Sequence, residues 1–309
     1  MRTAAARTLL ALTAAVAAAG CSSSSAVGGS PAAAGSGSVS AVVGFYPYEF
    51  VTARVGGDAV EVTNLTEPGA EPHDLELSPR QVAAVSEADL VVYSAGFQPA
   101  VDEAVEQQAD DRALDVLSVV ELRDTAEDSE EGHAQEGHAD GDPHVWLDPV
   151  RLGAIATEVA ERLAEVDGAN AEDHRARAAE LTAELTALDE ELRAGLASCE
   201  RRSIVTSHDA FGYLAQAYDL EQVAIAGLSP DDEASPQRLA EVADRAEAAG
   251  VTTIFFEELV SPKVAESLAR EVGATAEVLS PLEGPPDSGD YVTAMRSNLQ
   301  KLRAALGCT

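Results

Sequence analysis

The chain has 309 residues, of which 54 are acidic and 20 are basic, so its formal net charge at pH 7 is −34. At roughly 100–200 residues per domain this length predicts two domains, and a hydrophobic fraction of 46% indicates a folded chain rather than a disordered one. So few Lys and Arg residues cannot neutralise many phosphates, which excludes nucleic acid as a partner and leaves cations as candidates.

The first 20 residues have the pattern of an export signal. Arg2 and Arg7 precede an apolar run at 9–19, which is too short to anchor a protein across a bilayer. Small residues then lead directly into Cys21, which resembles a bacterial lipobox and predicts cleavage before a lipid-modified Cys21. The other interpretation is an ordinary secretory signal with an incidental cysteine. Both predict an exported protein; the first anchors it by lipid at the outer face of the cell membrane or in the periplasm.

A first α/β lobe is expected at 39–165, after a flexible Ser/Gly/Ala-rich tether at 21–38. Runs typical of strands alternate with runs typical of helices, which predicts a parallel sheet. The expected strands are 40–45, 59–65, 90–93 and 114–119, and the expected helices are 49–54, 79–88 and 99–108.

A long helical region follows at about 150–198. Gly168 and Asn170 are expected to break it, with Asn170 capping a second helix at 171–196 that carries leucines at helical spacing. At 1.5 Å per residue this helix spans roughly 40 Å. We therefore expect a rigid linker helix at 166–200.

A second lobe is expected at 201–309. Its expected strands are 203–206, 222–226, 252–256 and 276–279, and its expected helices are 210–218, 235–249, 262–272 and 291–306. The predicted fold class is α/β, with two Rossmann-like parallel-sheet lobes joined by one long rigid helix. Once Cys21 is acylated, Cys199 and Cys308 are the remaining cysteines, and because an oxidising compartment permits a disulfide, we predict a Cys199–Cys308 bridge.

One segment, 124–142, breaks the alternation. It holds eight acidic residues and two histidines but no Lys or Arg, so it cannot form a core. It is either a plain surface insertion or an auxiliary loop that collects metal through His133 and His138.

Three of the six histidines lie where ligands gather in α/β proteins. His73 follows the strand at 59–65, His208 follows the strand at 203–206, and His144 precedes a helix. Ligands bind outside the carboxyl ends of parallel strands, so these three side chains predict one metal site. His174, on the long helix beside charged residues, is expected to be solvated.

Three imidazoles and one carboxylate make a tetrahedral set that suits Zn²⁺, and a closed set of four binds rather than catalyses. Glu283, after the strand at 276–279, is the expected fourth ligand, with Glu71 and Glu257 as rivals. Asp148 and Asp209 either orient histidines or cap the helices that follow them. Binding is expected to weaken as the pH falls through the range near 6–7, where imidazole becomes protonated.

Four motifs together resemble the zinc/manganese-specific solute-binding lipoproteins of bacterial ABC importers. They are EPHD at 71–74, DPHVWLDP at 142–149, SHDAFGY at 207–213 and YVTAMRSNL at 291–299. The resemblance spans nearly all of 39–309. It implies two lobes joined by a backbone helix, with one metal ion between them held by His73, His144 and His208.

The resemblance also favours zinc. Manganese-type members usually carry a carboxylate where His208 stands and an aspartate where Pro281 stands. In some zinc-type members a Pro-Leu-Glu sequence supplies a ligand, here Glu283, whereas others use water. An acidic loop that contains histidine is a further zinc-type trait, and three imidazoles suit Zn²⁺ better than Mn²⁺.

The predicted function is therefore capture of Zn²⁺ outside the cytoplasm and its delivery to an ABC permease by a monomeric, membrane-anchored protein that is not an enzyme. The alternatives are the same role for Mn²⁺, an exported zinc hydrolase and a cell-surface adhesin. Against the hydrolase, the chain has neither an HExxH nor a Gly-x-Ser-x-Gly motif.

Overall fold

The computed structural model of the chain describes residues 38–123 and 141–309. The predicted signal, Cys21, nearly all of the tether, and His133 and His138 lie outside the described residues.

The first sheet consists of four parallel strands in the order β2-β1-β3-β4. Its strands are β1 (Val39–Val43), β2 (Val60–Asn64), β3 (Leu90–Tyr93) and β4 (Ala113–Asp115), and its helices are α1 (Tyr46–Gly56), α2 (Pro79–Glu87) and α3 (Pro99–Gln108). Two of the helices begin at proline, which favours the first helical turn. Ser78 and Gln81 form a capping box at the start of α2.

The second sheet repeats this arrangement, with the order β6-β5-β7-β8 and parallel pairing throughout. Its strands are β5 (Ser203–Thr206), β6 (Glu221–Ala224), β7 (Thr253–Phe256) and β8 (Thr275–Val278), and its helices are α6 (Gly212–Ala217), α7 (Pro236–Ala248), α8 (Lys263–Val272) and α9 (Tyr291–Leu306). The prediction of two parallel-sheet α/β lobes is confirmed.

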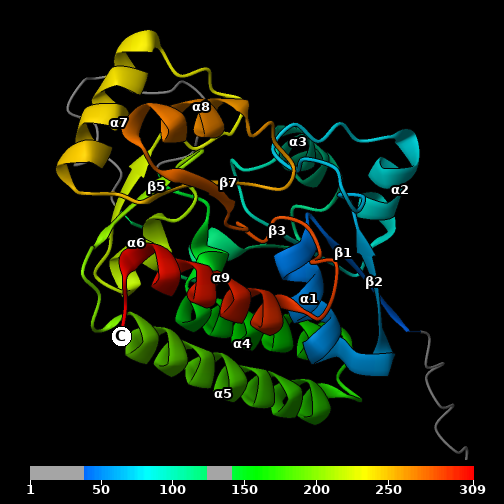
Figure 1. Cartoon of the computed structure of the whole chain (residues 1–309). Coiled ribbons are helices and arrows are strands. Elements are labelled where there is room, and N and C mark those ends of the chain that lie inside the picture. The colour runs from blue at the N-terminus through cyan, green and yellow to red at the C-terminus, as the bar shows by residue number, and fades with distance from the viewer. Residues whose placement is uncertain (1–37, 124–140) are drawn as a thin grey trace, which may run out of the picture. The chain divides into compact units, whose positions relative to one another are not determined.

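Two long helices, α4 (Pro149–Val166) and α5 (Ala171–Leu196), lie between the sheets in the chain. Helix α5 packs against α1 and α4 on the side of the first sheet and against α9, which follows the second sheet (Figure 1). Its buried face carries Leu181, Leu185, Leu188, Leu192 and Leu196. The spacing of 3 or 4 residues places these leucines on one stripe, so 26 residues, about 39 Å of helix, support both lobes.

The core is shared between the lobes. One hydrophobic cluster includes Phe45 and Trp146 beside the first sheet, Leu185 on α5, and Phe211 and Tyr291 beside the second. Two smaller clusters lie on the outer faces, one under α2 and α3 and one under α7 and α8. Because packed cores resist deformation, the shared cluster holds the two lobes together at the level of their inner helices.

Two expectations for the helical region are wrong. Asn170 occupies the N-cap position of α5, but its side chain donates to Asp167 and makes no capping bond. His174 is fully buried rather than solvated. Its Nε2 lies 3.2 Å from Asp167 Oδ2 and its Nδ1 lies 3.3 Å from the carbonyl oxygen of Val55. The side chain therefore joins the start of α5 to α1, a contact that local sequence does not reveal.

The strand expected at 114–119 is also too long. Strand β4 ends at Asp115, whose side chain accepts the backbone N–H of Leu117 and starts a short 3₁₀ helix, Val116–Ser118. A disulfide joins Cys199, just after α5, to Cys308, just after α9. Among the described residues, no helix combines the length and apolar character that crossing a membrane requires.

Candidate metal centre

His73 lies in the loop that follows β2. The buried amide of Gln98 supports this loop by donating to the carbonyl oxygen of Pro72 at 3.1 Å and to Thr66 Oγ1 at 3.0 Å. The imidazole packs against Phe97, with 4.3 Å between the ring centroids. Contacts with the backbone and with an aromatic ring thus fix the position of this side chain.

His144 immediately precedes the 3₁₀ helix Val145–Leu147, which leads into α4. Its Nδ1 lies 2.8 Å from Asp142 Oδ1, and the same oxygen accepts its backbone N–H at 3.0 Å. Asp142 is fully buried. A carboxylate on Nδ1 favours the tautomer whose Nε2 lone pair is available to a metal.

His208 follows β5 and is held in the same way by a more distant residue. Its Nδ1 lies 2.5 Å from Glu257 Oε1, at the end of β7, and the hydroxyl of Ser207 donates to this oxygen as well. Glu257 is buried. The Nε2 atom of His208 consequently faces the same space as that of His144, 3.4 Å away.

Glu283 lies in the loop between β8 and α9. Asn298 makes two hydrogen bonds to the backbone of Ser280, and the indole N–H of Trp146 donates to the carbonyl oxygen of Pro281 at 2.7 Å. Leu282 has a φ of 58°, a left-handed conformation that is unfavourable for a bulky side chain. The surrounding contacts hold this conformation, which directs Glu283 inward.

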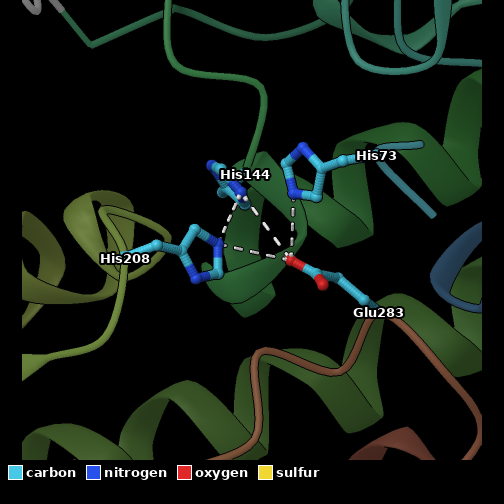
Figure 2. Close-up of side chains that lie close together, drawn as sticks. All are labelled: His73, His144, His208 and Glu283. Carbon is cyan, nitrogen blue, oxygen red and sulfur yellow. Dashed lines mark hydrogen bonds and ion pairs between the residues drawn. The ribbon is translucent and has the colours of Figure 1, made fainter. Parts of the chain in front are cut away.

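These four side chains converge on one point (Figure 2). Oε1 of Glu283 lies 3.5 Å from Nε2 of His73, 3.8 Å from Nε2 of His144 and 3.6 Å from Nε2 of His208. A tetrahedral zinc ion with bonds of about 2.0–2.1 Å separates neighbouring ligand atoms by about 3.3–3.4 Å. The observed spacing is close to this geometry.

All four residues are buried, with relative solvent accessibilities between 0% and 7%. Two of the converging atoms, Nε2 of His73 and Oε1 of Glu283, are buried without a hydrogen-bond partner among the described residues. Buried polar atoms normally have partners, so atoms of this kind that face one another indicate a place for a cation.

The electrostatics of the two lobes differ. Burial lowers the pKa of His208, but the carboxylates of Glu257 and Glu283 outweigh burial and raise the pKa to about 10. Burial lowers the pKa of His144 and outweighs the opposing effect of Asp142. Burial raises the pKa of Glu283, whereas its contacts with His208 and His73 lower it further, so the net direction is downward. Without metal, the raised pKa therefore favours a proton on His208, in the second lobe.

The other candidate acids lie outside the four-membered cluster. Glu71 Oε2 accepts the backbone N–H of Asp74, and Glu257 lies behind His208 as its hydrogen-bond partner. Asp148 caps α4 by accepting the N–H of Val150, and Asp209 forms an ion pair with Arg123 at 3.4 Å. Within residues 38–123 and 141–309, no hydrogen bond or ion pair joins Asp148 or Asp209 to a histidine.

The carboxylates that orient His144 and His208 are thus Asp142 and Glu257, respectively. A sequence signal was available for Asp142, which is two residues before His144 in the same motif. For Glu257 the signal was weaker, because both Glu257 and Glu283 follow strands of the second sheet and only their positions in space distinguish their roles.

The chain is similar to known proteins of zinc uptake. Residues 41–305 match the family model ZnuA, the periplasmic component A of a zinc-uptake complex. The chain is 37% identical over 278 residues to the high-affinity zinc uptake system protein ZnuA of Bacillus subtilis, covering 86% of each chain. It is 36% identical over 295 residues to the zinc-binding protein AdcA of Streptococcus pyogenes serotype M6, covering 86% of this chain and 56% of AdcA. The chain thus spans little more than half the length of AdcA.

Among solved structures, the laminin-binding protein Lmb of Streptococcus agalactiae superposes with a TM-score of 0.78 at 31% identity. The match covers 87% of this chain and 99% of Lmb, which is described as a bifunctional protein with adhesin and metal transporting activity. From the family match over 41–305, together with the extent of identity to its relatives, the chain belongs to the ZnuA family of zinc-uptake components.

Proposed function

We propose that this protein captures Zn²⁺ outside the cytoplasm and delivers it to the permease of an ABC importer. His73, His144, His208 and Glu283 are the proposed ligands. The observation that carries the proposal is the convergence of these four buried side chains on one point at near-tetrahedral spacing. The proposed lobes are 39–165 and 201–309, joined by the helix within 166–200, and each lobe contributes two ligands.

The donor set favours zinc over manganese. Three imidazoles and one carboxylate are ligands that Zn²⁺ accepts readily, whereas Mn²⁺ prefers sites dominated by oxygen. The set also favours binding over catalysis. Catalytic zinc sites keep a position open for water, and four protein ligands complete a tetrahedron.

We further propose that the protein is exported and anchored to the outer face of the membrane by a lipid on Cys21. The lipobox-like sequence supports this, as does the periplasmic role in the description of the family. All four proposed ligands come from one chain, so a monomer has a complete site.

The experiment is a competitive chelator titration of the full chain with Zn²⁺ and, separately, with Mn²⁺. We expect one high-affinity Zn²⁺ per chain and much weaker binding of Mn²⁺. A crystal structure with anomalous data collected at the zinc edge then identifies the ion and its ligands. Failure to bind zinc in the micromolar range, or an ion bound away from these four residues, contradicts the proposal.

Adhesion is a second candidate role, because Lmb is described as an adhesin as well as a metal transporter. A lipid-anchored protein at the cell surface is placed to contact proteins outside the cell, laminin among them. Binding of the full chain to immobilised laminin tests this role directly, with albumin-coated wells as the control. Equal signals from laminin and albumin contradict it.

A further inference from the structure

We infer that Arg123 is a positioning residue for the metal centre, because it holds the carboxylate that orients His144. The inference rests on the proposed zinc-binding function and adds a residue outside the ligand set. Arg123 lies directly before the segment 124–140, and Asp142 follows the same segment two residues beyond its end.

The first step in the argument is the position of Asp142. Its Oδ1 is engaged by the ring and the backbone N–H of His144. Its Oδ2 is fully buried and faces Arg123 Nε at 3.3 Å. A buried carboxylate is costly unless a cation or several donors compensate it, and the guanidinium of Arg123 is the cation that lies against Asp142.

The second step is the contact of Arg123 with the other lobe. Its backbone N–H donates to the hydroxyl of Tyr213 at 3.0 Å, and that hydroxyl donates to the carbonyl oxygen of Asp142 at 2.8 Å. Its Nη2 lies 3.4 Å from Asp209 Oδ2, beside His208. The phenol of Tyr213 on α6 therefore bonds Arg123 and Asp142, which lie on either side of the segment 124–140. The guanidinium of Arg123 lies between Asp142 of the first lobe and Asp209 of the second.

The third step is the space in which the guanidinium lies. A Cβ atom added at Gly212 would lie 2.2 Å from Cζ of Arg123. Gly212 is the first residue of α6 and does not have a left-handed φ, so its backbone conformation does not require glycine. Because glycine has no side chain, Gly212 leaves room for the guanidinium of Arg123. A larger residue at this position would displace it.

Together these contacts make the orientation of a first-lobe ligand depend on the second lobe. His144 is held by Asp142, Asp142 faces Arg123, and Arg123 is held by Tyr213, Asp209 and the surface of Gly212. Loss of the guanidinium leaves Asp142 buried without that cation and frees it to turn away from His144.

The test compares zinc affinities of the full chain and its variants by chelator competition. Arg123→Gln is expected to weaken binding 10- to 100-fold, the usual effect of losing a residue behind a metal ligand. Arg123→Lys is expected to recover part of the loss, because it restores the charge. Arg162→Gln is the matched control, since it removes a cation from an exposed ion pair with Glu158 far along α4.

A double-mutant cycle distinguishes positioning from general damage. If Arg123 acts through Asp142, Arg123→Gln has little further effect in an Asp142→Asn chain. Binding by Arg123→Gln within twofold of the wild type overturns the inference, as does an undiminished effect in the Asp142→Asn background.

Gly212→Ala provides a second variant that does not depend on the folding of Arg123→Gln. Alanine favours a helix more than glycine does, so thermal stability should be retained, while the new methyl group displaces the guanidinium and weakens zinc binding by about 10-fold or more. Unchanged affinity in Gly212→Ala counts against the inference. A wild-type chain that binds no zinc overturns the proposed function itself, which is a different result from wild-type binding with insensitive variants.

Discussion

The two histidines at the centre of the site are oriented by the same device but in different electrostatic surroundings. In each case a buried carboxylate contacts Nδ1, from Asp142 for His144 and from Glu257 for His208. Behind His144, Asp142 also faces a cation, Arg123, and Oε1 of Glu283 lies 3.6 Å from Nε2 of His208 and 3.8 Å from Nε2 of His144. The pKa of His144 is lowered and that of His208 is raised. Similar local geometry thus shifts the pKa values of the two imidazoles in opposite directions.

The largest expected effect comes from removing an imidazole from either lobe. His144→Ala and His208→Ala should each lower zinc affinity by more than about 100-fold, because residues behind the ligands alone account for 10- to 100-fold. Chelator competition measures this loss, and circular dichroism checks that the lobes remain folded.

The control for these variants is His174→Gln, which removes a buried imidazole outside the site. It should lower stability and leave zinc affinity unchanged. A His208→Ala protein that binds as tightly as the wild type would remove His208 from the ligand set.

The next effect comes from the orienting carboxylates. Asp142→Asn and Glu257→Gln should each weaken zinc binding by about 10- to 100-fold. A proton on His208 competes with zinc, and Glu257→Gln weakens this competition because it lowers the pKa of His208. The relief is greater at pH 7 than at pH 9. The loss of zinc affinity in Glu257→Gln should therefore be smaller at pH 7 than at pH 9. Affinities measured at both pH values test the difference.

The neighbouring exposed residue supplies the matched control, Glu258→Gln. It should bind zinc like the wild type at both pH values. Equal losses in Glu257→Gln at pH 7 and pH 9 would contradict the proposed competition between proton and metal.

A smaller effect concerns the stability of the metal-free protein. A folded-state pKa of about 10 for His208, above the ordinary 6.5, stabilises the fold fully below pH 6.5, and this stabilisation is lost as the pH rises toward 10. His144, with a lowered pKa, is neutral across this window, and Glu283 is ionised. Urea unfolding of the metal-free chain should therefore show stability falling between pH 6.5 and pH 9.5.

Bound zinc should remove most of this slope, because the metal replaces the proton. His208→Gln, which has no proton to lose, should also show a flatter profile. A metal-free wild type whose stability is constant from pH 6.5 to pH 9.5 would show that His208 is neutral throughout.

The smallest expected effect on the site comes from the disulfide. Cys199→Ser with Cys308→Ser opens a link between residues 109 positions apart and should lower the free energy of unfolding by about 2–5 kcal/mol. Zinc affinity should stay within about twofold of the wild type, since the site is held by the shared core and the strand-end loops. Denaturant unfolding and chelator competition on the same sample separate the two quantities. A large loss of zinc affinity would show that the Cys199–Cys308 disulfide also helps to hold the ligands in position.

Much of the fold was predictable from local patterns. Prolines mark the starts of α2 and α3, leucines at helical spacing define the buried face of α5, and short apolar runs alternate with helices in both lobes. Since ligands bind outside the carboxyl ends of parallel strands, the loops that carry His73 and His208 could each be assigned to the ligand-binding edge of its own sheet.

What the tertiary structure decided is the role of side chains that meet across the chain. Glu257 and Glu283 both follow strands of one sheet, yet one lies behind His208 and the other faces it. His174 has the sequence surroundings of an exposed residue and is buried because α1 packs over it. The hydrophobic period of a sequence determines which elements form and which faces they bury. Contacts between residues 49 or 119 positions apart in the chain depend on how those elements pack. The hydrophobic pattern does not specify this packing.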